Sequence, residues 1–187
     1  MEDSLFVFIG KKLSITEFKP DVANDKVLMD NYFTAKYLIM EVVYGNFHLD
    51  TIEFTVADHY GHPKFSKYDD VILYTVKDSG QWYHVKYMYT PVYKTLDNEW
   101  AGVYQGRDYA HVNNENTTIK PVKIKFRDKI VIDTSETTWK TFSNVYDPKY
   151  YKTKGREAYP THGNYVPQLF ELKKNGFLKY IGYFENE

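Results

Sequence analysis

Apolar and polar residues alternate along most of the first half of this chain, which predicts β-strands. The clearest alternation covers residues 50–57, where Ile52, Phe54 and Val56 share one face of the predicted strand. Similar patterns predict strands over residues 5–9, 11–18, 32–44, 71–76 and 82–89, and shorter ones over 100–105, 122–126 and 130–132. We found no segment of three turns with the 3.6-residue periodicity of an amphipathic helix. The pattern therefore predicts an all-β protein.

The C-terminal end has the pattern of a β-hairpin. Residues 168–174 and 177–184 flank Asn175-Gly176, and Asn-Gly is the preferred sequence of a two-residue type I′ turn. Residues 146–167 come before it, are rich in tyrosine and are interrupted by proline and glycine. We expect this stretch to be a long loop, a kind of segment that is often functional.

The 187 residues are enough for one domain with a sizeable core. We expect residues 1–105 to form a five-stranded barrel or a curved antiparallel sheet. Residues 119–187 are expected to add C-terminal hairpin extensions and the tyrosine-rich loop to the same core, after a polar connection. The predicted organisation is thus a single β domain over residues 1–187.

Part of the chain resembles a known family of barrels. The similarity lies in Phe6–Lys11, in the strand that ends Val43-Tyr44-Gly45-Asn46, and in the later segments Thr51–Phe54 and Val71–Tyr74. In this order, residues 5–90 resemble OB-type barrels, especially the netrin/TIMP-like variety. The resemblance implies that residues 1–105 form an OB-like five-stranded barrel with a binding role. Because the inhibitory members of that family use an N-terminal cysteine and disulfides, and this chain has no cysteine, no functional residue carries over.

Charge and composition narrow the classes of partner. The net charge of −1 offers no overall field to attract nucleic acid or an anionic membrane. Residues 117–187 carry 13 Lys and Arg against 8 Asp and Glu, so the C-terminal part could meet an acidic partner. The apolar run over residues 5–9 is too short for a signal peptide or a membrane span. We therefore expect a cytoplasmic protein by default, with no membrane partner.

The candidate catalytic and metal-binding residues gather in one loop. Asp58, His59 and His62 lie within five residues, and the His-x-x-His spacing can bring two imidazoles to one metal, with His84 or Glu53 as a further ligand. His84 is also a candidate general base. The simpler interpretation is that the two loop histidines make hydrogen bonds within a tight turn. On this interpretation we expect no bound metal and no cofactor.

Aromatic residues make up 18% of the chain, and several lie beside lysine in predicted strands. Rings interleaved with lysine can stack on a sugar or a base and can also anchor a protein interface. The candidate ligand-binding residues are Trp82, His84, Lys86, Trp100, Tyr150, Tyr151 and Tyr159.

No classical catalytic motif is present, and tyrosine is abundant, with 19 residues. These observations predict a non-enzymatic binding module, with a protein as partner. Two alternatives remain: a hydrolase or lyase with a His/Asp or metal site around residues 58–62, and an oligosaccharide-binding module.

Overall fold

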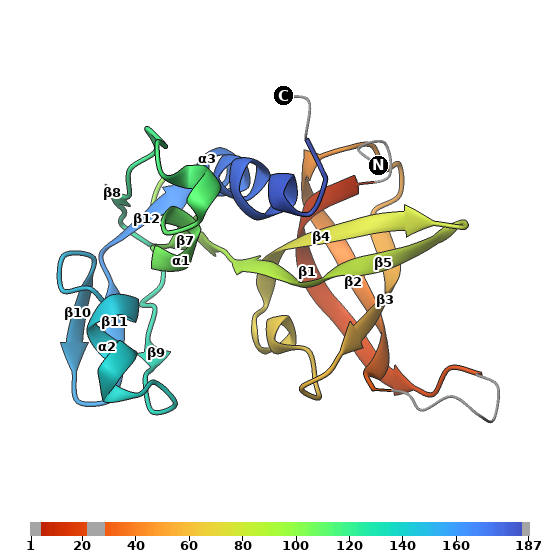
Figure 1. Cartoon of the computed structure of the whole chain (residues 1–187), viewed down its shortest axis with the longest axis horizontal. Coiled ribbons are helices and arrows are strands. Elements are labelled where there is room, and N and C mark those ends of the chain that lie inside the picture. Colours follow the sequence, from red (N-terminus) through yellow and green to blue (C-terminus); the bar gives the residue numbers. More distant parts are fainter. Residues whose placement is uncertain (1–4, 22–28, 185–187) are drawn as a thin grey trace. The chain divides into compact units, whose positions relative to one another are not determined.

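The computed structural model describes residues 5–21 and 29–184 of the chain (Figure 1). Its backbone contacts divide into two compact units, Met1–Pro91 and Val92–Glu187, which we call unit 1 and unit 2. Strands account for 47% of the residues and helices for 18%, so the expected all-β class is confirmed. The expectation of a single shared core stays a prediction.

Unit 1 is one strongly curved sheet of five strands. They are β1 (Leu5–Phe18), β2 (Asn31–Tyr44), β3 (Thr51–Asp58), β4 (Asp70–Asp78) and β5 (Gln81–Pro91), with the 3₁₀ turn η2 (Lys64–Lys67) between β3 and β4. The strand order is β1-β2-β3-β5-β4, and β1 pairs with β4 as well as with β2. The β3–β5 pair is parallel, and the other pairs are antiparallel.

The core of unit 1 follows the predicted alternation closely. Ile52, Phe54 and Val56 are all buried, as the pattern of residues 50–57 predicts. They pack in one cluster with Phe6, Phe8, Phe33, Ala35, Tyr37, Phe65, Val71 and Leu73. The inner surface of the sheet is therefore filled mainly by aromatic and branched side chains, which stabilise unit 1 through burial of apolar area.

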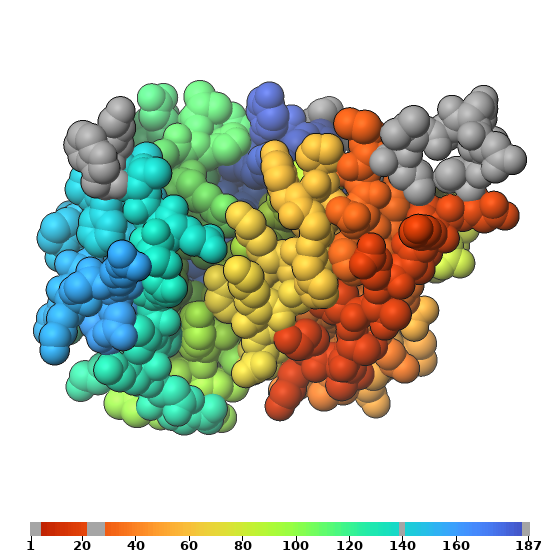
Figure 2. Space-filling model, turned by 90° about the horizontal axis from the view of Figure 1, so that it is seen from below, coloured from red at the N-terminus to blue at the C-terminus, as the bar shows by residue number. Residues whose placement is uncertain are grey.

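The first strand is longer than the sequence predicts. Two strands were expected on either side of Gly10, but β1 runs without a break from Leu5 to Phe18. A register shift at Ile9/Gly10 bends it, and a Cβ at Gly10 would lie 2.7 Å from a ring carbon of Phe8. The bend lets the first half pair with both β4 and β2, whereas the second half pairs with β2 and is mostly exposed (red in Figure 2).

Unit 2 contains two small sheets and several short helices. The first sheet has the order β6-β7-β12-β8, and the second β10-β11-β9. Their strands are β6 (Tyr93–Lys94), β7 (Trp100–Val103), β8 (Val122–Lys123), β9 (Ile132–Asp133), β10 (Tyr151–Lys154), β11 (Glu157–Pro160) and β12 (His162–Tyr165). The helical segments are α1 (Gly106–Tyr109), η3 (Val112–Asn114), α2 (Trp139–Val145), α3 (Val166–Lys173) and η4 (Lys174–Leu178).

The predicted C-terminal hairpin is wrong, because this segment is helical. Helix α3 begins at Val166 and buries Val166, Leu169 and Leu172, and the π-helical turn η4 follows it directly. Asn-Gly does not form a turn between strands here. Gly176 lies so close to η3 that a Cβ would be 2.9 Å from Nδ2 of Asn114. Packing of the buried leucines and this close approach outweigh the local preference for a type I′ turn.

The predicted tyrosine-rich loop over residues 146–167 is also wrong. Most of it forms β10, β11, β12 and the start of α3. Tyr146, Tyr151 and Ala158 are buried together, with Phe142 and Tyr150 packed against them. The tyrosines thus form a small core of unit 2, because their rings bury apolar area, and the hydroxyl of Tyr151 also donates to the carbonyl of Tyr104.

Candidate functional site

The loop after β3 begins with a turn that is fixed by Asp58. This residue is only 7% exposed, and its Oδ1 accepts a hydrogen bond of 2.9 Å from the backbone N–H of Tyr60. A carboxylate that accepts from the backbone two residues later is typical of an Asx turn. Asp58 therefore shapes the turn and directs Tyr60 outward.

The two histidines of this loop have separate partners. His59 Nδ1 lies 2.7 Å from the carbonyl oxygen of Met29; because a carbonyl only accepts, this nitrogen carries the proton. His62 Nδ1 lies 2.9 Å from Oγ of Ser66, and its ring packs against Phe33. Within residues 5–21 and 29–184, no three His, Asp or Glu side chains are grouped so that they could hold a metal ion.

His84 lies in the core of unit 1. Its ring packs between Phe65, at 4.8 Å between ring centroids, and Phe54, at 6.2 Å. Burial lowers the pKa of the imidazole to about 4, against a usual value of 6.5. The ring is neutral at pH 7, and Nε2 donates a hydrogen bond of 2.9 Å to the carbonyl oxygen of Met88.

This hydrogen bond spans an irregular stretch of β5. Leu73 pairs with Tyr89 and Thr75 with His84, so residues 85–88 of β5 lie opposite Tyr74 alone. Within the stretch, Tyr87 has a φ of +64°, a left-handed conformation that is unfavourable for a bulky residue. The bulge interrupts the alternation of β5 and directs Lys86 and Tyr87 to the surface, since both side chains are exposed.

Six residues from three segments meet at this surface, and we call them the aromatic platform: Met29, Asp30, His59, Tyr60, Lys86 and Tyr87. The rings of Tyr60 and Tyr87 lie 5.7 Å apart, and Tyr60 and His59 lie 5.5 Å apart. Tyr60 is 79% exposed, Met29 70% and Tyr87 45%. Large side chains with apolar area thus lie together at the surface, where most of this area remains exposed to solvent.

Polar contacts hold the platform in one arrangement. Lys86 Nζ donates to both carboxylate oxygens of Asp30, at 2.8 and 2.7 Å, and lies 5.4 Å from the ring centroid of Tyr87. The hydrogen bond to Asp30 raises the pKa of Lys86. The backbone N–H of His59 donates to the hydroxyl of Tyr87 over 3.3 Å. These contacts position the rings before any ligand arrives, which reduces the entropy lost on binding.

The structure distributes the other predicted ligand-binding residues over both units. Trp82 is half-buried and packs against Phe6 and Phe47 of unit 1. In unit 2, Lys94 Nζ lies 4.0 Å from the ring centroid of Trp100. The tilted rings of Tyr150 and Tyr104 have centroids 4.1 Å apart, and Tyr159 lies near Lys129. Tyr151 is buried, and its hydroxyl donates to the carbonyl of Tyr104.

Sequence reasoning missed four members of the platform: Met29, Asp30, Tyr60 and Tyr87. Tyr60 stands inside the predicted loop, so its position between two histidines could have drawn attention to it. The regular alternation of residues 82–89 instead assigned Tyr87 to the same strand face as Tyr83, Val85 and Tyr89, and it contains no glycine that would signal a bulge.

Among the residues that the structure describes, no helix is both long enough and apolar enough to cross a membrane. Comparisons of the chain with protein-family models, with curated proteins and with solved structures each found no match.

Proposed function

We propose that this protein is a non-enzymatic binding module that contacts a protein partner through the aromatic platform. The observation that carries the proposal is the pair of exposed rings, Tyr60 and Tyr87, 5.7 Å apart. Exposed tyrosines that are already ordered are typical anchors of protein interfaces, because they bury a large area at a low entropy cost.

We infer that unit 1 is an OB-type barrel. The strand order β1-β2-β3-β5-β4 and the pairing of β1 with β4 support this inference, as does the parallel β3–β5 pair. OB barrels bind their ligands beside β2 and β3 and the loop that joins β1 to β2. Two members of the platform support the same region here, because Asp30 comes directly before β2 and His59 directly after β3.

The backbone of Tyr87 adds support for a binding role. A bulky residue at φ +64° costs about 1–2 kcal/mol, and an extended strand would avoid this cost. Strained residues of this kind concentrate at functional sites, where the surrounding structure holds them in place. Here the bulge exposes the ring of Tyr87 to solvent, whereas an extended β5 would direct this ring elsewhere. A partner that covers the ring would bury its apolar area.

An oligosaccharide is the second candidate ligand. Two adjacent tyrosine rings beside Lys86 and Asp30 provide both a stacking surface and hydrogen-bonding groups for a sugar. A protein partner is favoured because Met29, 70% exposed, adds flexible apolar area, while Lys86 and Asp30 already satisfy each other at the rim.

Affinity capture tests the proposal with three immobilised proteins: the wild type, a Tyr60→Ser/Tyr87→Ser variant and a Tyr180→Ser control. Tyr180 is 70% exposed and belongs to unit 2, so the control removes a comparable exposed ring that is not a member of the platform. The purified partner should bind the wild type and the control with equal affinity, and the platform variant at least about tenfold more weakly. Equal binding by all three proteins would contradict the proposal, and binding of glycans but of no protein would favour the second candidate.

A further inference from the structure

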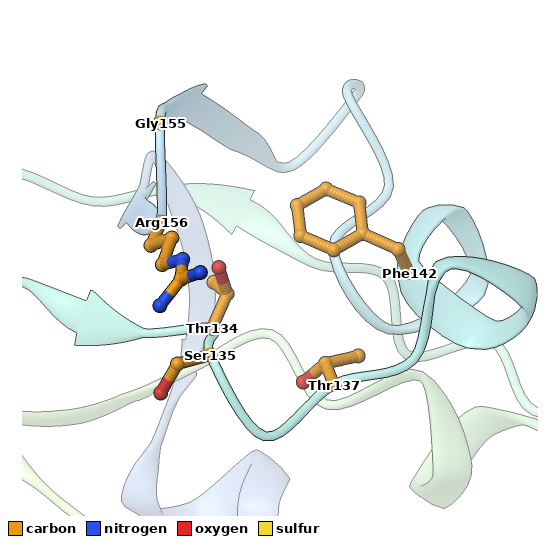
Figure 3. A pocket seen from close by; sticks show the side chains of 6 residues that line it. All are labelled: Thr134, Ser135, Thr137, Phe142, Gly155 and Arg156. Atoms are coloured by element: carbon orange, nitrogen blue, oxygen red, sulfur yellow. The ribbon is translucent and has the colours of Figure 1, made fainter.

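Unit 2 contains an open pocket of about 440 Å³, and none of the residues that line it belongs to the aromatic platform. It is lined by Thr134, Ser135, Thr137, Phe142, Gly155 and Arg156 (Figure 3). A pocket of this volume is large enough for a small organic molecule. One end is polar, with a guanidinium and hydroxyl groups, and the ring of Phe142 forms a separate apolar wall.

The position of Arg156 is set by the β10–β11 hairpin. Gly155 and Arg156 form its two-residue turn, and Gly155 has a φ of +60°, as the first position of a type II′ turn requires. The backbone carbonyl of Arg156 accepts from the N–H of Thr134 over 2.9 Å, which ties the turn to the segment after β9. The hairpin and the Thr134–Thr137 segment are therefore held side by side, one on each side of the pocket.

The guanidinium of Arg156 is available to a ligand. Among the described residues, no carboxylate lies within 4.0 Å of it to form an ion pair. Asp133 interacts with it only electrostatically, and its carboxylate accepts from the backbone N–H of Ser135 at 2.9 Å. This contact uses the carboxylate of Asp133 to hold the Ser135 turn, so the cation of Arg156 keeps its donors for another group.

Thr134 gives the pocket a second fixed polar group. The residue is only 5% exposed, and its hydroxyl points into the pocket near Arg156 (Figure 3). Within the described part of the chain this hydroxyl makes no hydrogen bond to another residue, and it opens to the pocket rather than being enclosed. A hydroxyl held on a buried residue and open to the pocket is fixed in position and free to bond a ligand oxygen.

We propose that this pocket binds a phosphate monoester whose organic group packs against Phe142. A planar guanidinium pairs with two phosphate oxygens, and hydroxyl groups donate to the remaining ones. Unit 2 also carries 15 Lys and Arg against 12 Asp and Glu, so its net charge of +3 favours an anion. Phe142 is half-buried and supplies apolar area that inorganic phosphate would leave uncovered.

Phenyl phosphate, inorganic phosphate and phenol are suitable probes, with binding followed by NMR titration of the full chain. Phenyl phosphate should bind about tenfold or more tightly than inorganic phosphate, and phenol should not bind measurably. Arg156→Gln should weaken both phosphates at least tenfold. Phe142→Ala should remove only the advantage of phenyl phosphate, since it leaves the polar end of the pocket unchanged.

Lys152→Gln is the matched control. It removes one positive charge from the same hairpin, at an exposed position that does not line the pocket. The proposal predicts a change of less than about twofold for this variant. Equal losses in Arg156→Gln and Lys152→Gln would mean that phosphate follows general charge, and the proposal would be overturned. Absence of phosphate-dependent shifts at Thr134–Thr137 in the wild type would overturn it equally.

Discussion

The buried imidazole of His84 donates a hydrogen bond to the carbonyl oxygen of Met88, four residues further along the same strand. The bond closes the bulge of β5 from inside unit 1, while Lys86 and Tyr87 between them face solvent. The imidazole that the sequence offers as a candidate base is therefore engaged in a contact within its own strand. Its ring supports the backbone conformation that presents Tyr87.

The first prediction concerns pH. Because the pKa of His84 is about 4 in the folded state and 6.5 when unperturbed, the unfolded chain takes up a proton first as the pH falls. This contribution to stability is complete above pH 6.5 and is lost as the pH falls toward 4. About 2 kcal/mol should disappear between pH 7 and pH 5.

His84→Gln isolates this contribution, because a glutamine amide can still donate to Met88 but does not titrate near these pH values. Urea unfolding at pH 7 and pH 5 should show a smaller loss of stability for the variant than for the wild type. Identical losses in the two proteins would show that His84 is not shielded from water as described.

The second prediction concerns the strain at Tyr87. Glycine adopts a φ of +64° without steric cost, so Tyr87→Gly should leave the free energy of unfolding unchanged or raise it by up to about 1 kcal/mol. Tyr83→Gly in the same strand is the control, since Tyr83 has no positive φ and is similarly exposed, at 38%. It should lower stability by about 1 kcal/mol. The free energy of unfolding of both variants can be measured by denaturant titration. A larger loss for Tyr87→Gly than for Tyr83→Gly would show that the backbone of Tyr87 is not strained.

The sequence predicts regular strands well, but it does not predict bulges or contacts between residues that are far apart in the chain. Ile52, Phe54 and Val56 alternate with polar residues and are buried as expected, since one face of β3 meets the core. The bulge at Tyr87 leaves no such mark, because the period-2 pattern continues through it. The platform also depends on Asp30, which is far from Lys86 in sequence and meets it only in the folded chain.

The C-terminal segment shows a different limit. Leu169 and Leu172 have helical spacing, but Asn175-Gly176 has the strongest local signal for a hairpin, and the sequence alone gives no reason to prefer the leucines. In the helical arrangement Gly176 packs against Asn114 of η3, which is 62 residues away in the sequence. A pattern of neighbouring residues cannot predict such a contact.

A third prediction follows for that segment. Leu172 is buried in α3, so Leu172→Ala should lower the free energy of unfolding by about 2–5 kcal/mol. Phe177 in η4 is 38% exposed, and Phe177→Ala should cost less than about 1 kcal/mol. Chemical denaturation of both variants tests the helical assignment. A larger loss for Phe177→Ala would favour the hairpin that the sequence predicts.

The fourth prediction concerns the close approach of β12 and β7. A Cβ at Gly163 would lie 1.9 Å from the carbonyl oxygen of Gly102, and backbone cannot rotate away as a side chain can. Gly163→Ala should therefore destabilise the protein by about 3 kcal/mol or more.

Gly155→Ala is the control for that substitution. A Cβ there would meet no atom within 4 Å, and only its φ of +60° is unfavourable, which corresponds to about 1–2 kcal/mol. Similar thermal unfolding temperatures for the two variants would contradict the described pairing of β7 and β12.

The central claim is that the aromatic platform is the surface that meets a protein partner. Site-specific photocrosslinking tests it most directly, with a photoreactive phenylalanine analogue in place of Tyr60 or, as the control, of Tyr180. In cells that make this protein, the probe at position 60 should give one discrete protein adduct, which disappears when Tyr87→Ser is added. The probe at position 180 should not give that adduct. An adduct of the same mass from both positions, or one that persists with Tyr87→Ser, would contradict the claim.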